Sequence, residues 1–204
     1  MGLISNGTTI FDAGAMAAGL GSAVTFIKKL TASGSANLTF VNGSSNVTLD
    51  GTYKLYMFVF NNIHPATDDK NFTVNFRDGG SNYDAPKITS YFHATHAEGD
   101  GSESLSYITG HDLNTGATGA QILAEGISND ADHGANGYLY LYNPGSTVMQ
   151  KQITARSVNT RHSNIVADCF IGGNIEVTAA VDGVQFAMSS GNIDSGTISL
   201  FGIG

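Results

Sequence analysis

Residues that cross-link or rigidify a fold are scarce in this chain. Tryptophan is absent, cysteine occurs once and proline three times in 204 residues. A single cysteine, Cys169, excludes a disulfide within the chain, and it lies in the mostly apolar run 165–171. In such a run a cysteine usually behaves as a small buried hydrophobic side chain. We therefore predict an unreactive thiol and a fold held together by its hydrophobic core, which a chain of this length can form without cross-links.

Positive charge is also scarce. The chain has 9 Lys and Arg against 17 Asp and Glu, which gives a formal net charge of −8. The pair Lys28–Lys29 is the nearest approach to a basic run. Nucleic-acid binding requires a basic stripe that neutralises phosphates. We therefore expect no nucleic-acid partner.

Long apolar runs are missing as well. A membrane-spanning helix needs about 20 consecutive apolar residues, and no segment approaches that length. The first twenty residues carry Asp12 and lack the basic and apolar regions of a secretory signal. We expect a protein that is made in a cytoplasm, without classical export and without a membrane partner.

Short β-type runs fill the chain from Val24 onward. Runs of β-branched and aromatic residues alternate with clusters of Gly, Asn, Asp and Ser, at a spacing of about ten residues. Turn sequences such as Asn143-Pro144-Gly145 separate them. This pattern predicts an all-β fold, an antiparallel β-sandwich or jelly roll. The expected strands cover residues 24–30, 37–41, 46–49, 54–60, 72–76, 88–93, 105–108, 121–124, 138–142, 149–155, 166–171, 184–188 and 197–201.

Two of these strands carry more specific patterns. Both faces of 54–60 are apolar, which predicts a central strand that is covered on each side. Residues 138–142 place three tyrosines on one face and two leucines on the other, which predicts one partly solvent-exposed face and one buried face. The acidic, polar segments 65–70, 98–103 and 127–136 should be surface loops at one end of the sandwich.

We divide the chain into an arm, residues 1–22, and a single β-sandwich domain, residues 23–204. The arm is rich in Gly and Ala, and Phe11 with a few aliphatic residues could anchor it. Two interpretations stay open: a loose terminus, or an arm that orders against a neighbouring subunit.

The polar residues form no recognisable catalytic or metal-binding motif. His93 and His96 are three residues apart on a predicted strand, so they should point to opposite faces and not share a metal. A metal site here would need a bulge and carboxylates such as Asp100. Acidic pairs do not complete a calcium-loop register, and phosphate-loop and nucleophile-elbow motifs are absent. Without tryptophan the most obvious sugar-stacking platform is missing, although tyrosine could serve. We expect no catalytic, cofactor-binding or metal-binding residues, and no enzyme.

Several longer strings do resemble a known family. They resemble small structural proteins that are encoded by tailed phages of aquatic bacteria, cyanophages among them, over about Phe26 to Ile203. The strings are Phe26-Ile-Lys-Lys-Leu-Thr-Ala-Ser33, Leu38-Thr-Phe-Val-Asn-Gly43, Gly51-Thr-Tyr-Lys54, Phe58-Val-Phe-Asn-Asn-Ile-His-Pro65, Tyr138-Leu-Tyr-Leu-Tyr-Asn-Pro-Gly-Ser-Thr147, Val181-Asp-Gly-Val-Gln-Phe186 and Ser190-Gly-Asn-Ile-Asp-Ser-Gly-Thr-Ile198.

The resemblance implies a virion structural protein with a jelly-roll-like fold. The leading hypothesis is a capsid decoration (cement) protein, a homotrimer that binds the major capsid protein and stabilises the assembled head. The alternative is a tail component, such as a fibre, nozzle-associated or adaptor protein, that contacts host glycan or other tail proteins. A third hypothesis is a lectin or carbohydrate-active enzyme.

Overall fold

Strands make up the regular structure of the chain. The computed structural model describes residues 3–6, 8–12, 15–16, 23–101 and 103–204, and none of these residues is helical. No helix in this part of the chain is therefore available to span a membrane. The strands are β1 (Leu3–Ser5), β2 (Thr8–Asp12), β3 (Ala15–Met16), β4 (Val24–Ser35), β5 (Leu38–Val41), β6 (Leu55–Pro65), β7 (Lys70–Arg77), β8 (Lys87–Ala97), β9 (Ser104–Tyr107), β10 (Leu113–Ala117), β11 (Gln121–Ile127), β12 (Ala135–Tyr142), β13 (Lys151–Thr160), β14 (Ile165–Ile175), β15 (Gly183–Met188) and β16 (Ile193–Ile203).

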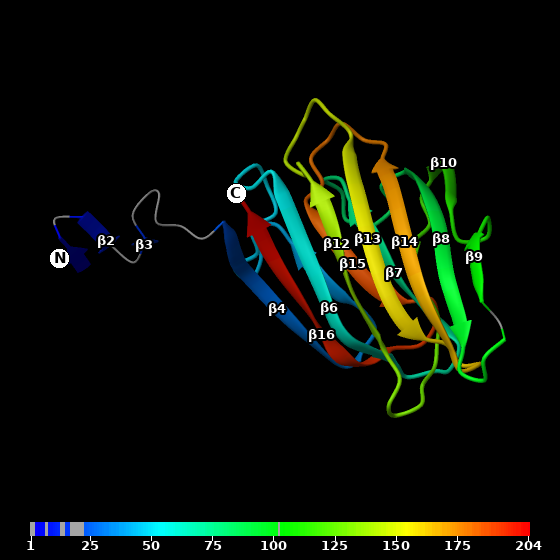
Figure 1. The fold of residues 1–204 in the computed structure, drawn as a ribbon. Coiled ribbons are helices and arrows are strands. Elements are labelled where there is room, and N and C mark those ends of the chain that lie inside the picture. The colour runs from blue at the N-terminus through cyan, green and yellow to red at the C-terminus, as the bar shows by residue number, and fades with distance from the viewer. Residues whose placement is uncertain (1–2, 7, 13–14, 17–22, 102) are drawn as a thin grey trace.

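Two antiparallel sheets pack face to face, which confirms the predicted β-sandwich. The large sheet has nine strands in the order β10-β8-β14-β13-β12-β6-β16-β4, with β9 paired to β8. The small sheet has four strands in the order β11-β7-β15-β5. Figure 1 shows the strands of the large sheet side by side, with β7 and β15 of the small sheet behind them. The large sheet therefore has an inner face toward the small sheet and an outer face turned away from it.

An aromatic cluster forms the centre of the core. Phe58 and Phe60 point inward from β6 and meet Phe186 of β15. Phe40 and Phe72 complete the cluster from the small sheet, where Phe72 stacks on Phe186 at 5.7 Å between ring centroids. All five rings are at most 1% exposed. Burial of aromatic surface on this scale is the main stabilising contribution between the sheets.

Most of the predicted strands are present, and three details differ. Residues 46–49 form no strand, although Val47 and Leu49 are buried. Strand β10 and the arm strands β1–β3 were not predicted. Strand β6 is central, as expected, but only one of its faces is fully covered: Tyr56 and Phe58 are buried, whereas Met57 is half-buried on the outer face.

The arm forms a small sheet of its own. Strands β1, β2 and β3 pair antiparallel with one another, and none of these described strands pairs with the sandwich. In Figure 1 the labelled strands β2 and β3 lie to one side of the sandwich, beyond the start of β4. Residues 1–2, 7, 13–14 and 17–22 of the predicted arm lie outside the described residues.

The polar loops do gather at one end of the sandwich. The Asp68 side chain accepts a hydrogen bond from the Asn129 amide at 3.1 Å, which joins the loop after β6 to the loop after β11. Asp69 lies 2.9 Å from His162 in the loop between β13 and β14, and the amide of Glu98 donates to the carbonyl of Asn164. We call this end, where the loops at 66–69, 98–101, 128–134 and 161–164 meet, the loop end.

Candidate functional site

An aromatic ladder runs along β12 on the outer face of the large sheet. Tyr138, Tyr140 and Tyr142 alternate with the buried Leu139 and Leu141. The ring centroids lie 5.1 Å apart between Tyr138 and Tyr140 and 6.4 Å apart between Tyr140 and Tyr142. Tyr138 and Tyr142 are each 37% exposed, so the ladder presents its rings to solvent, as the alternation predicts.

A second aromatic wall stands two strands away. Phe170 of β14 stacks on Phe92 of β8 with the ring centroids 4.8 Å apart and the planes nearly parallel. Arg156 of β13 lies between the two walls, since register places it opposite both Tyr138 and Phe170. Its guanidinium lies 4.8 Å from the Phe170 ring centroid and donates two hydrogen bonds, of 2.9 and 2.6 Å, to Asp168. These contacts hold Arg156 in one orientation and neutralise its charge.

The space between the two walls is a groove. Its floor contains Gly172, where an added Cβ would meet only the Ser90 hydroxyl, at 3.6 Å. Four hollows of about 540, 450, 450 and 630 Å³ follow one another along β12 and β13. Neighbouring hollows share lining residues: Asn136 joins the first two, Tyr138 the next two, and Tyr142 the last two. All four hollows are shallow and open to solvent, and we call the row that they form the outer groove.

The outer groove ends in a polar hollow beside the loop end. His64 and His133 line this hollow with Asp132, Asn62 and Asn136. The Nδ1 atoms of both histidines are buried and make no hydrogen bond, although Asp194 lies 3.5 Å from the first and Asp130 3.7 Å from the second. Buried polar atoms without partners are uncommon in native proteins and often belong to sites that take a ligand or water. This convergence was not predicted, because it joins residues from β6 with the loop between β11 and β12.

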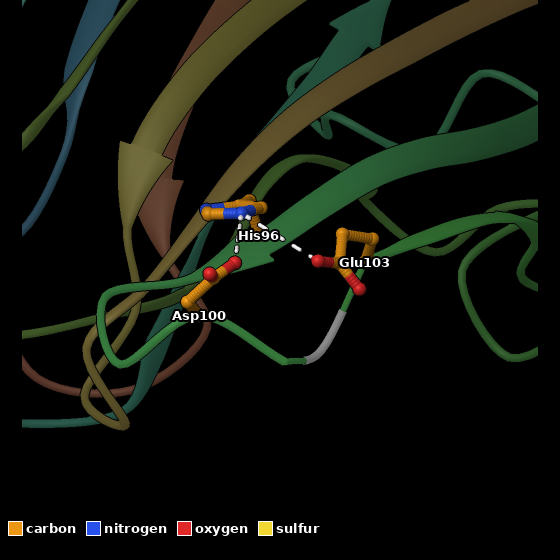
Figure 2. Close-up of side chains that lie close together, drawn as sticks. All are labelled: His96, Asp100 and Glu103. Carbon is orange, nitrogen blue, oxygen red and sulfur yellow. Dashed lines mark ion pairs between the residues drawn. The ribbon is translucent and has the colours of Figure 1, made fainter.

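A histidine and two carboxylates converge on the hairpin between β8 and β9 (Figure 2). The Nε2 atom of His96 lies 3.6 Å from Asp100 and 3.9 Å from Glu103, and the three ligand atoms lie within 4.8 Å of one another. Imidazole and carboxylate are ligands for divalent metals such as Zn²⁺. All three side chains are more than half exposed, however, and ion pairs of this kind are common on protein surfaces without a metal. The expectation that the protein uses no metal stays a prediction.

His93, in contrast, points into the sandwich, so the two histidines of β8 do face opposite ways. Its Nδ1 atom lies 2.7 Å from Glu125 of β11. Glu125 is also 3.0 Å from His111 and 3.1 Å from Arg161, and its side chain is 4% exposed. Burial acts to raise the pKa of Glu125, but its contacts with His111, His93 and Arg161 outweigh burial and hold the pKa below its usual range. Glu125 is therefore an anion that joins the two sheets.

The contact of Glu125 with His93 is one of several polar contacts between β8 and β11, which we call the polar seam. The others lie farther from the loop end. Thr89 donates a hydrogen bond to Gln121, and Lys87 donates from Nζ to the carbonyl of Gly119 at 2.8 Å. Lys87 is fully buried, and burial lowers its pKa to about 8 against the opposing charge of Asp84. These contacts close the sandwich where β8 and β11 do not share backbone hydrogen bonds, so we interpret the seam as structural.

Cys169 is buried, as predicted. It is 0% exposed, and burial raises the pKa of its thiol to about 11. A thiol with such a pKa is largely protonated at neutral pH and is a poor nucleophile.

Comparisons with known proteins add no assignment to these sites. Protein-family models, curated proteins and solved structures gave no significant match to this chain.

Proposed function

We propose that this protein is a structural component of a tailed-phage particle and that it acts as a capsid decoration protein. It would sit on the head as a homotrimer in contact with the major capsid protein. Binding only to the assembled shell stabilises that shell by mass action, and symmetry repeats each weak contact many times. The resemblance of the strings between Phe26 and Ile203 to phage structural proteins supports a place in a phage particle. The arrangement of the arm and β4 supports assembly with other subunits.

The observation that supports assembly is that the chain has both an arm and a long strand at the edge of the large sheet. β4 has 12 residues and is the last strand of the large sheet among the residues that the structure describes, and β1–β3 form a separate sheet that precedes it in the chain. A terminal strand can add a strand from a neighbour, and an arm can reach a neighbouring subunit.

The copy number in purified particles tests this proposal. Quantitative mass spectrometry should give a ratio to the major capsid protein near one or a simple fraction of it. A ratio lower by an order of magnitude or more would contradict decoration and favour a tail component.

The arm is tested separately. Deleting residues 1–22 should leave a folded sandwich that no longer binds heads. If the truncated protein still decorates heads fully, the arm does not carry the contact.

The tail component remains a second candidate because the outer groove offers a surface for a ligand. A fibre, nozzle-associated or adaptor protein would use such a surface toward host glycan or another tail protein. Immuno-electron microscopy of intact particles with an antibody to the sandwich would place the label on the tail in that case, and on the head for decoration.

A further inference from the structure

We propose that the outer groove binds an uncharged carbohydrate chain. The inference does not depend on the place of the protein in a particle, since it rests only on the groove. Carbohydrates are recognised by aromatic rings that cover their apolar C–H faces and by polar side chains that hydrogen-bond their hydroxyls. The outer groove supplies both kinds of group along its length.

The aromatic groups form two facing walls. Tyr138, Tyr140 and Tyr142 line one side in sequence, and Phe92 lines the other side. Phe170 lies between Phe92 and the Arg156 guanidinium, so its ring positions these two side chains. Because the tyrosines recur every second residue on one strand, they can contact successive units of a chain that runs along β12. An extended ligand fits this arrangement better than a single compact one.

The polar groups lie between the walls and at both ends. Arg156 and Asp168 fix each other in the middle of the groove, so both are oriented before a ligand arrives. Gln152 and Asn174 line the far hollow, and the hollow at the loop end is lined by His64, His133 and Asn136. Amides, imidazoles and a fixed ion pair offer both donors and acceptors, as sugar hydroxyls require.

The charge of the groove argues against a polyanion. The charged side chains that line it are Arg156, Asp132 and Asp168, and Arg156 is already neutralised by Asp168. Asp100 and Glu103 lie at the same end of the sheet, beside His96. Nucleic acid and acidic polysaccharides would meet a slightly negative surface.

The sheet beneath the groove argues against a peptide strand. β12 pairs with both β6 and β13, and β13 pairs with both β12 and β14. A peptide that lies on this face finds no free strand edge, so its backbone amides would lose water without gaining ladder hydrogen bonds. Sugar rings have no such row of backbone groups to satisfy.

Affinity electrophoresis of the full chain tests the proposal. The gels contain dextran, soluble starch, mixed-linkage β-glucan, galactomannan or arabinoxylan, with dextran sulfate and alginate as anionic probes. At least one neutral polysaccharide should retard the protein, and the anionic ones should not. Tyr140→Ala should weaken the retarding interaction about tenfold, the loss expected for one buried aromatic contact. Tyr140→Phe keeps the ring and should bind nearly as well.

Phe26→Ala is the matched control, because Phe26 is an exposed aromatic residue on the same face that lines none of the four hollows. It should bind like the unchanged protein, and thermal unfolding should show that all variants are folded. The proposal is wrong if no neutral polysaccharide retards the protein, if dextran sulfate retards it as strongly, or if Tyr140→Ala binds normally. A change in oligomeric mass on Tyr140→Ala without any effect on polysaccharide would instead make the groove a subunit interface.

Discussion

At Glu125 one buried carboxylate meets His93, His111 and Arg161 between the two sheets. Replacing this carboxylate by an amide leaves the other three groups without their anion. We expect Glu125→Gln to lower the free energy of unfolding at neutral pH by about 2–4 kcal/mol. Urea denaturation measures this change. The control Asp168→Asn breaks a much more exposed ion pair and should cost about 1 kcal/mol or less.

The pH dependence of that difference has a definite sign. The pKa of Glu125 is lower in the folded protein than its ordinary value, so the unfolded chain binds the proton first as the pH falls. The stabilisation is fully present above the pKa of the unfolded chain, about 4.3, and is lost as the pH falls through the lower folded pKa. The gap between the unchanged protein and Glu125→Gln should therefore shrink below about pH 4. A gap that stays constant to about pH 3 would contradict this account.

Lys87 affects the free energy of unfolding at alkaline pH. Burial lowers its pKa to about 8, whereas an unfolded lysine titrates near 10.4. Between these values the unfolded chain holds a proton that the folded protein has released, so the free energy of unfolding rises with pH. Relative to Lys87→Met, the unchanged protein should gain on the order of 1–3 kcal/mol between about pH 7.5 and 10. Lys151, another buried lysine, is present in both proteins and cancels. Equal pH slopes for the two proteins would show that Lys87 titrates normally.

At the scale of the element, Gly137 controls how closely β12 approaches β13. A Cβ at this position would lie 2.3 Å from the carbonyl oxygen of Arg156 and 2.8 Å from the Cα of Ser157. Both contacts are with backbone, which cannot rotate away. Gly137→Ala should therefore destabilise the protein by about 1–3 kcal/mol or more, as overpacking does.

Gly172→Ala is the comparison for this prediction, because the added methyl group would reach only the Ser90 hydroxyl at 3.6 Å. We expect its thermal midpoint to stay close to that of the unchanged protein, while Gly137→Ala lowers the midpoint by several degrees. Equal midpoints for the two variants would mean that β12 and β13 can separate at Gly137 without cost.

A comparison of the predicted strands with the observed ones shows what hydrophobic alternation can and cannot predict. Alternation identified the partly exposed Tyr face of β12 and the opposite orientations of His93 and His96 on β8 correctly, because alternation reports which side of a strand is buried. It failed at residues 46–49, where Val47 and Leu49 alternate in burial but the backbone bonds locally: the Gly43 amide donates to the Val47 carbonyl, and the Leu49 amide to the Asn42 side chain. Burial alternation does not reveal whether a partner strand is available.

Strand β10 was missed for a related reason. Its sequence, Leu113-Asn-Thr-Gly-Ala117, has no apolar alternation, and Gly116 has a positive φ. Its pairing to β8 shifts register between Leu113 and Ala117, as suits a short strand at the edge of a sheet. Likewise, the contacts of Glu125 could not be predicted, because it lies more than thirty positions from both His93 and Arg161 in the sequence. Only the packing of β11 against β8 brings these residues together.

For the whole molecule, the proposed assembly predicts an oligomer that depends on the arm. Analytical ultracentrifugation of the full chain should give a mass about three times that of the 21.2 kDa chain. Deletion of residues 1–22 should reduce the mass to that of one chain without loss of the β-sheet circular dichroism signal. A full chain that sediments as a monomer at high micromolar concentration would contradict a trimer.

The first strand of the sandwich begins, and its last strand ends, at the same corner of the domain. The amide of Gly204, after β16, donates a hydrogen bond to the carbonyl of Ala23, just before β4. A cargo domain joined after Gly204 would therefore emerge beside the point where the arm enters the sandwich. Bulky carboxyl-terminal fusions should then interfere with whatever the arm contacts, whereas insertions at the opposite end of the sheet, such as in the exposed turn 162–164 between β13 and β14, would leave that corner open. For display of foreign sequences, the turn is the better attachment point.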